Sequence, residues 1–90
     1  MDKIERFEDL QSWQRARQRA NSLYDLTAQP AFARDFNLRG QVQDAAGSVM
    51  HNISEGFDEG TDPEFIRFRK VARRSASEVQ SELYLALDRD

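Results

Sequence analysis

Cysteine is absent from this 90-residue chain, and histidine occurs once, as His51. Without cysteine the chain has no disulfide, no thiol redox chemistry and no thiolate metal site. One imidazole does not make a zinc-binding cluster, and helical periodicity turns His51 away from the neighbouring apolar side chains. We therefore expect His51 to be a solvated surface residue, and the sequence predicts neither a metal nor a cofactor.

Glycine and proline are also scarce, with four and two residues, and no apolar run approaches the roughly 18 residues of a membrane span. So few turn-forming residues disfavour a β-protein and indicate an all-α fold. The sequence shows no basic leader followed by an apolar stretch and a cleavage site. We therefore expect no secretory signal and no membrane contact, and a cytoplasmic protein.

Positive charge is in deficit, because 13 Lys and Arg stand against 16 Asp and Glu and give a net charge of −3. Such a chain lacks the positive field that general coating of nucleic acid requires, although a local basic patch remains compatible with it. A chain of this length forms one domain, residues 1–90, that removes only about 60–65% of its unfolded surface from water. Self-association would add stability.

Three segments carry apolar residues every three or four positions, which is the signature of amphipathic helices. The first predicted helix spans residues 7–29 and stops at Pro30, which cannot continue the hydrogen-bond ladder. The second spans residues 36–56 and ends because Gly56 supplies a left-handed conformation. The third spans residues 62–89.

The start of the third helix fits two patterns. Thr61 and Glu64 match a capping box, whereas Asp62 and Pro63 match a cap followed by proline at the first helical position. The apolar row that follows is close to a heptad repeat, which suits nearly parallel helix packing. We therefore expect an up-down antiparallel bundle with three helices present.

Three motifs in this order resemble a known family: RFEDLQSWQRAR near the beginning, NISEGF in the centre and EFIRFRKVARRSASE later. The chain resembles the four-helix-bundle proteins encoded within intervening sequences of bacterial 23S ribosomal RNA genes, and accessory proteins of diversity-generating retroelements look similar in architecture. The resemblance implies an up-down bundle that assembles into a ring-like homopentamer. It implies no established activity, and RNA or a nucleoprotein is the partner it suggests.

The sequence departs from the family pattern in one respect. The family has a fourth helix after the third, whereas this sequence stops at Asp90. We expect either a shortened member or a groove that another chain fills. Four apolar residues outside the predicted core are candidates for such an interface or, alternatively, single apolar residues on a surface. They are Phe32, Phe36, Val71 and Leu85.

Polar residues Ser48, Asn52 and Glu55 follow one edge of the apolar arc of the second helix. Glu55 as a catalytic base or metal ligand would need a second converging group, and no acid lies one turn from it in this helix. We therefore interpret the three as a structural polar seam that fixes helix register, in which Asn52 and Glu55 hydrogen-bond to neighbouring backbone or to an arginine such as Arg17. No catalytic residue is predicted, and a hydrolase using Glu55 is disfavoured.

A basic segment without any acid gives the strongest functional signal. Its members are Arg67, Arg69, Lys70, Arg73 and Arg74. They lie on the side of the third helix away from its apolar row, and Arg15 and Arg19 add charge to the outer face of the first helix. Lys and Arg at helical spacing suit phosphate contacts. The acids that can neutralise this segment are Asp58, Glu59, Asp62, Glu64, Glu78 and Glu82.

Two hypotheses follow. The first is a non-enzymatic, self-associating helical-bundle protein that binds RNA or a nucleoprotein through the basic segment. The second is a protein-interaction or scaffold module that uses the groove left by the absent fourth helix. Salt-dependent RNA binding distinguishes the first from the second.

Overall fold

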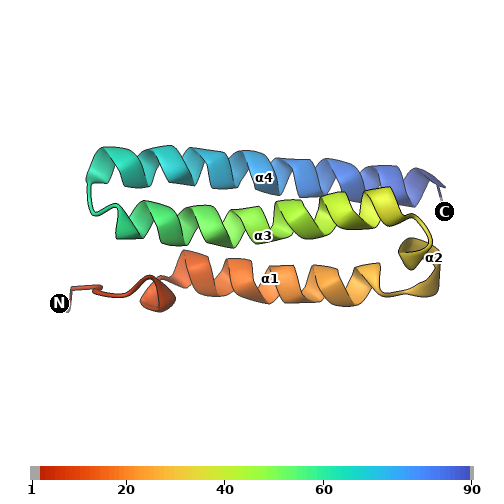
Figure 1. Ribbon diagram of the computed structural model, residues 1–90, viewed down its shortest axis with the longest axis horizontal. Coiled ribbons are helices and arrows are strands. Elements are labelled where there is room, and N and C mark those ends of the chain that lie inside the picture. The colour runs from red at the N-terminus through yellow and green to blue at the C-terminus, as the bar shows by residue number, and fades with distance from the viewer. Residues whose placement is uncertain (1–2, 90) are drawn as a thin grey trace.

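The computed structural model describes residues 3–89, so residues 1, 2 and 90 of the expected domain lie outside the description. The chain forms a 3-10 turn η1 (Phe7–Asp9) and helices α1 (Gln11–Thr27), α2 (Pro30–Ala33), α3 (Phe36–Asp58) and α4 (Asp62–Arg89). No strand occurs within residues 3–89, and the all-α prediction is confirmed. Figure 1 shows α1, α3 and α4 side by side, with the chain reversing direction between them. The molecule measures 47 × 20 × 17 Å.

The structure differs at both ends from the single helix expected over about residues 7–29. Leu10 is extended, with φ −72° and ψ 126°, and separates η1 from α1. This break lets Phe7 fold back so that its ring lies edge-on to Trp13, with the ring centroids 5.1 Å apart. At the other end α1 stops at Thr27.

The segment between α1 and α3 contains the short helix α2, so the described chain has four helices where three were expected. Gln29 is extended, and Pro30 begins α2. Proline suits the first position of a helix because the backbone N–H that it lacks would have no hydrogen-bond partner within the helix there. Asp35 then caps α3, where its Oδ1 accepts a hydrogen bond from the Leu38 N–H at 3.2 Å.

Gly56 does not end its helix, because α3 continues to Asp58 and the left-handed residue is Gly60, with φ +81°. Gly56 is instead buried where α3 meets α4. A Cβ at this position would lie 2.6 Å from the Phe68 Cβ, which is closer than real Cβ contacts. Glycine is therefore required at position 56 for close approach of two helices and not for its backbone conformation.

Thr61 caps α4. Its Oγ1 accepts a hydrogen bond from the Glu64 N–H at 3.4 Å, and Asp62 is the first residue of the helix. Of the two patterns that the sequence allowed, the structure shows the threonine cap. Asp62 and Glu64 in the first turn also complement the helix dipole.

The core lies along α3, which packs against α1 on one side and α4 on the other. Two adjacent clusters fill it. Ala20, Ala45, Ala46 and Val79 form one, and Ala16, Ile53 and Ala72 form the other. No comparable packing joins α1 to α4 within residues 3–89, so α3 is the only long helix there with two long neighbours. None of the described helices is both long and apolar enough to cross a membrane.

Candidate functional site: an open groove with basic surroundings

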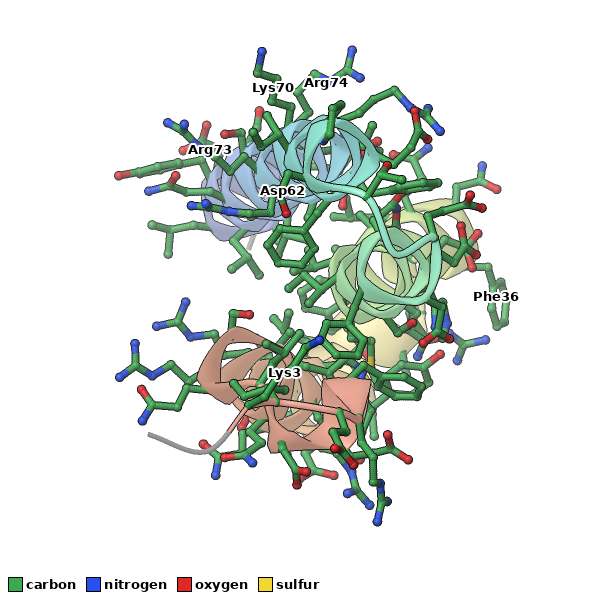
Figure 2. All side chains as sticks on the ribbon, turned by 90° about the vertical axis from the view of Figure 1, so that its left-hand side faces the viewer. Lys3, Phe36, Asp62, Lys70, Arg73 and Arg74 are labelled. Atoms are coloured by element: carbon green, nitrogen blue, oxygen red, sulfur yellow. The ribbon has the colours of Figure 1, made fainter. Side chains whose placement is uncertain are left out.

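A groove of about 710 Å³ runs between α1 and α4, with α3 as its floor. It opens on the side away from α3, as the end-on view of Figure 2 makes visible. The residues that line it are Ser12, Arg15, Ala16, Arg19, Ala20, Ser22 and Leu23 from α1, Ala46 and Val49 from α3, and Ala76, Val79, Gln80 and Leu83 from α4. All three long helices therefore contribute to one surface.

Most of the residues that line the groove are apolar, and four of them are alanines. Ala16, Ala20 and Ala46 are almost fully covered, because their side chains are short and their helices are close. Ala76 differs: it belongs to the apolar row of α4 but is exposed, whereas Ala72 and Val79 in the same row are buried. Ala76 thus lies on the edge of the row that borders the groove, where the helices of residues 3–89 leave it exposed.

A second hollow lies beyond the groove at the end of the bundle where α2 sits, and Leu83 lines both. Of the predicted interface residues, Phe32 and Phe36 line this hollow and Val71 and Leu85 do not. The Phe36 ring is 70% exposed and points outward beside α3, with the Arg39 guanidinium carbon 5.0 Å from its centroid. Val71 is half-buried and Leu85 is exposed.

The basic segment of α4 does not form one patch. Figure 2 shows Lys70 and Arg74 pointing away from α3, and Arg73 pointing toward the side on which the groove opens. Arg69 lies four residues before Arg73 and therefore shares its side of the helix. Apart from Arg67, the segment divides into an outer pair, Lys70 and Arg74, and a pair on the groove side of α4, Arg69 and Arg73.

Arg67 is already neutralised. Its guanidinium donates to Glu64 Oε2 from Nη2 at 2.9 Å and from Nε at 3.2 Å, and its Cζ lies 4.3 Å from the centroid of the Phe68 ring. The hydrogen bonds that Arg67 donates to Glu64 and the negative charge of Glu64 raise the pKa of Arg67. Of the acids expected to neutralise the segment, Glu64 alone forms an ion pair with it among the described residues.

Arg15 and Arg19 lie on the rim of the groove. The sequence predicted that they lie on an outer face of the first helix, and both are exposed. It did not predict that they lie beside a groove. Helical periodicity gives the angle of a residue from the core, whereas the groove exists only because α4 lies at some distance from α1. The sequence therefore held no signal for this placement.

The polar seam joins α3 to α4 through a residue that sequence reasoning missed. Ser48 Oγ lies 2.9 Å from Ser75 Oγ, and Asn52 Nδ2 donates to the Ser48 carbonyl at 2.8 Å and to Ser48 Oγ at 2.9 Å. Ser75 occupies the buried row of α4 between Ala72 and Val79, and its position in that row was an available signal.

Glu55 and Arg17 do not join this seam. Glu55 is exposed. The Arg17 guanidinium carbon lies over the Trp13 ring, 5.7 Å from its centroid, so Arg17 is not the partner of Asn52 that the sequence suggested. His51 is exposed as well. Within residues 3–89, no three His, Cys, Asp or Glu side chains are grouped so that they could hold a metal ion.

Two further buried polar residues were not expected. Thr27 is fully buried, donates to the Tyr24 carbonyl at 3.0 Å and accepts from Gln43 Nε2 at 3.0 Å, which links α1 to α3. Glu82 is 7% exposed between α4 and α3, and its Oε2 has no hydrogen-bond partner. Burial raises the pKa of Glu82, and the nearby Glu78 carboxylate raises it further.

Comparison with known families gives a match over residues 8–90 to the family described as 23S rRNA-intervening sequence protein. Neither the curated proteins nor the solved structures contain a match to this chain. The match covers almost the whole chain, including the second and third motifs and all of the first motif except Arg6 and Phe7. The chain therefore belongs to the 23S rRNA-intervening sequence protein family.

Proposed function

We propose that this chain is a non-catalytic interaction module that receives a helix in the groove between α1 and α4. Ala76 carries the proposal, because it is exposed and lines the groove although Ala72 and Val79, which flank it in the apolar row of α4, are buried. An amphipathic helix laid into an apolar groove is a common mode of protein recognition. With such a helix in place, the up-down arrangement becomes a four-helix bundle.

The shape of the groove supports this occupant. Ala16 and Ala20 on the α1 wall and Ala46 on the α3 floor have small side chains, so a helix backbone can approach α1 and α3 closely. Val49 and Leu23 are only half-buried and would become fully covered. Covering apolar surface contributes about 25 cal/mol per Å² removed from water.

Substitution at Ala76 tests the proposal. The probe is a labelled synthetic helix of about 18 residues, roughly five turns, with a Leu and Ala stripe and Gln on its flanks. We expect it to bind the native chain and to bind Ala76→Trp about tenfold more weakly, because the indole occupies the groove. Fluorescence anisotropy measures both affinities.

Ser77→Trp is the matched control, because Ser77 is exposed, adjacent in sequence and absent from the groove lining. It should leave the affinity unchanged. Equal affinities for all three proteins, or no binding to the native chain, would contradict the proposal.

Self-association is the form of this proposal in which a second copy supplies the helix, and a homopentamer is the assembly that the family resemblance suggests. Light scattering of the chain alone at low and high salt tests it. A discrete oligomer that Ala76→Trp dissociates supports self-association through the groove. A monomer at both salt concentrations assigns the groove to a different partner.

RNA or another nucleic acid is the second candidate partner, and the outer pair Lys70 and Arg74 favours it. Both side chains are exposed and point away from the bundle, and neither forms an ion pair within residues 3–89. We expect Arg74→Gln to weaken binding to an RNA hairpin and to reduce the slope of log K against log salt by roughly 0.7–0.9. Arg67→Gln, at the neutralised arginine, is the control, and equal effects of the two variants would contradict this candidate.

A further inference from the structure

Residues 3–10 precede α1 at the end of the bundle that also holds the turn between α3 and α4 (Figure 1). We infer that this segment is a strap that opens and closes over Trp13 while the three long helices stay folded. The groove between α1 and α4 is a separate site, because neither the strap nor Trp13 lines it. Opening of the strap is therefore independent of the proposed function.

Leu10 is the hinge of the strap. It is extended, with φ −72° and ψ 126°, between the 3-10 turn η1 and the first turn of α1. Its side chain packs against the core cluster of Ala16, Ile53 and Ala72, which anchors the hinge to the helices. A few backbone angles at the end of an element are enough to absorb the motion of a hinged segment. Residues 3–9 can therefore move about Leu10 while α1 keeps its place.

The interactions that hold the strap down are few and lie at the surface. None of residues 3–10 is buried. The ion pair from Arg6 Nη2 to Glu8 Oε2, at 3.1 Å, joins two residues of the strap to each other. From the helices, Gln14 Nε2 donates to the Glu8 carbonyl at 2.9 Å, and this hydrogen bond is exposed. A segment with few buried contacts and exposed hydrogen bonds opens at a lower free energy than the core does.

Phe7 is the side chain through which the strap contacts Trp13. The two rings meet edge-on, with their centroids 5.1 Å apart and their planes at 66°. Edge-to-face aromatic pairs attract each other beyond the effect of the area that they bury. Trp13 itself packs against the same core cluster as Leu10, and the Arg17 guanidinium carbon lies 5.7 Å from the centroid of its ring. Trp13 is therefore fixed to the helices, and Phe7 moves against it.

Urea unfolding of the native chain tests whether the strap opens by itself. Trp13 is the only tryptophan, so its fluorescence reports on the strap, whereas far-ultraviolet circular dichroism reports on the helices. Breaking one aromatic pair and one exposed hydrogen bond costs far less than unfolding a domain. We therefore expect the fluorescence to change at lower urea than the helical signal. Coincident transitions overturn the inference, because the strap would then open only when the helices unfold.

Phe7→Ala removes the contact with Trp13. It should raise the ratio of open to closed strap roughly twofold to tenfold, as the loss of an aromatic pair allows. Acrylamide quenching of Trp13 should therefore increase, and the early fluorescence change should move to lower urea. Phe36→Ala is the matched control, because Phe36 is 70% exposed at the beginning of α3 and contacts Arg39 instead of Trp13. It should leave both measurements unchanged.

Gln14→Ala removes the hydrogen bond to the strap and keeps the contact between Phe7 and Trp13. It should raise the same ratio about twofold to fivefold, as the loss of one exposed hydrogen bond allows. Gln14 is exposed and alanine favours a helix, so the midpoint of the helical signal should not fall. Increased quenching in this variant therefore comes from the strap and not from a weakened α1.

Two further results would contradict the strap. If Trp13 is quenched equally in the native chain, Phe7→Ala and Gln14→Ala, the segment does not cover the indole and the inference is overturned. If Phe36→Ala increases the quenching as much as Phe7→Ala does, the whole bundle has loosened and the inference is overturned as well. Binding of a helix in the groove is measured separately at Ala76, so either result leaves the proposed function standing.

Discussion

The contact between α3 and α4 and the groove between α1 and α4 are built from similar small residues. The first is a closed contact, whereas the second is open. Across the closed contact, Gly56 admits Phe68 and Ser48 meets Ser75. On the open side, Ala16 from α1 and Ala76 from α4 line the groove. Small residues allow close packing in both places, but a neighbour is present in only one. The comparison teaches that residue size permits an interface, whereas specific steric and hydrogen-bonding partners identify one that is already filled.

Substituting two glycines of α3 by alanine should give the largest difference in free energy of unfolding between two variants. In Gly56→Ala the new Cβ would meet the Phe68 Cβ at 2.6 Å, and both atoms are fixed close to their backbones. Gly40→Ala adds a Cβ with nothing within 4 Å, so it gains only helix propensity. We expect the two variants to differ by about 2–3 kcal/mol in free energy of unfolding, with Gly56→Ala less stable than the native chain and Gly40→Ala more stable. Urea unfolding measures both, and equal stabilities would show that the helices can separate at Gly56 without cost.

Replacing alanine by leucine in the α3–α4 contact and in the groove should give the next largest difference in free energy of unfolding. Ala45 is 5% exposed in the cluster that contains Val79, so Ala45→Leu forces extra volume into a filled contact. We expect it to lower the free energy of unfolding by about 2 kcal/mol. Ala76→Leu points into the groove and should change stability by no more than about 0.5 kcal/mol. Thermal unfolding of both variants provides the measurement, and a comparable loss in Ala76→Leu would mean that the groove is narrower than the structure shows.

The sequence predicted the helical class because periodicity depends on neighbouring residues in the chain. It did not distinguish the two uses of Gly56, since the same residue type serves a left-handed turn and a close approach, and only the position of Phe68 decides between them. Likewise, the exposure of Arg15 was predictable from its helix, but its place on a groove rim depends on where α4 lies. The close approach at Gly56 and the position of Arg15 beside the groove both depend on how two helices pack, which the pattern of a single helical segment does not determine.

Glu82 allows the closed contact to be tested through pH. Burial raises its pKa, so the folded state favours the protonated carboxyl and is penalised when Glu82 ionises. The penalty is complete above the raised pKa and absent below the ordinary value of about 4.3. We expect Glu82→Gln to stabilise the fold by about 1–2 kcal/mol near neutral pH and by progressively less as the pH falls toward that ordinary value. Urea midpoints over this range give the difference, and a gain independent of pH would show that Glu82 does not titrate in the contact.

The hydrogen bond between Ser48 and Ser75 should give the smallest effect on stability. It tests whether a specific hydrogen bond, and not only closeness of the two helices, joins α3 to α4. Ser48 Oγ lies 2.9 Å from Ser75 Oγ, and Asn52 also donates to Ser48 Oγ, so removing Ser75 leaves one partner in place. A double-mutant cycle of Ser48→Ala and Ser75→Ala should therefore give a coupling of only about 0.5–1 kcal/mol. Ser22 and Ala76 stand on opposite walls of the groove with no hydrogen bond between them, and the cycle of Ser22→Ala with Ala76→Ser should give a coupling near zero. Equal couplings in the two cycles would mean that the polar link does not distinguish the closed contact from the open one, and that apolar packing holds α4 to α3.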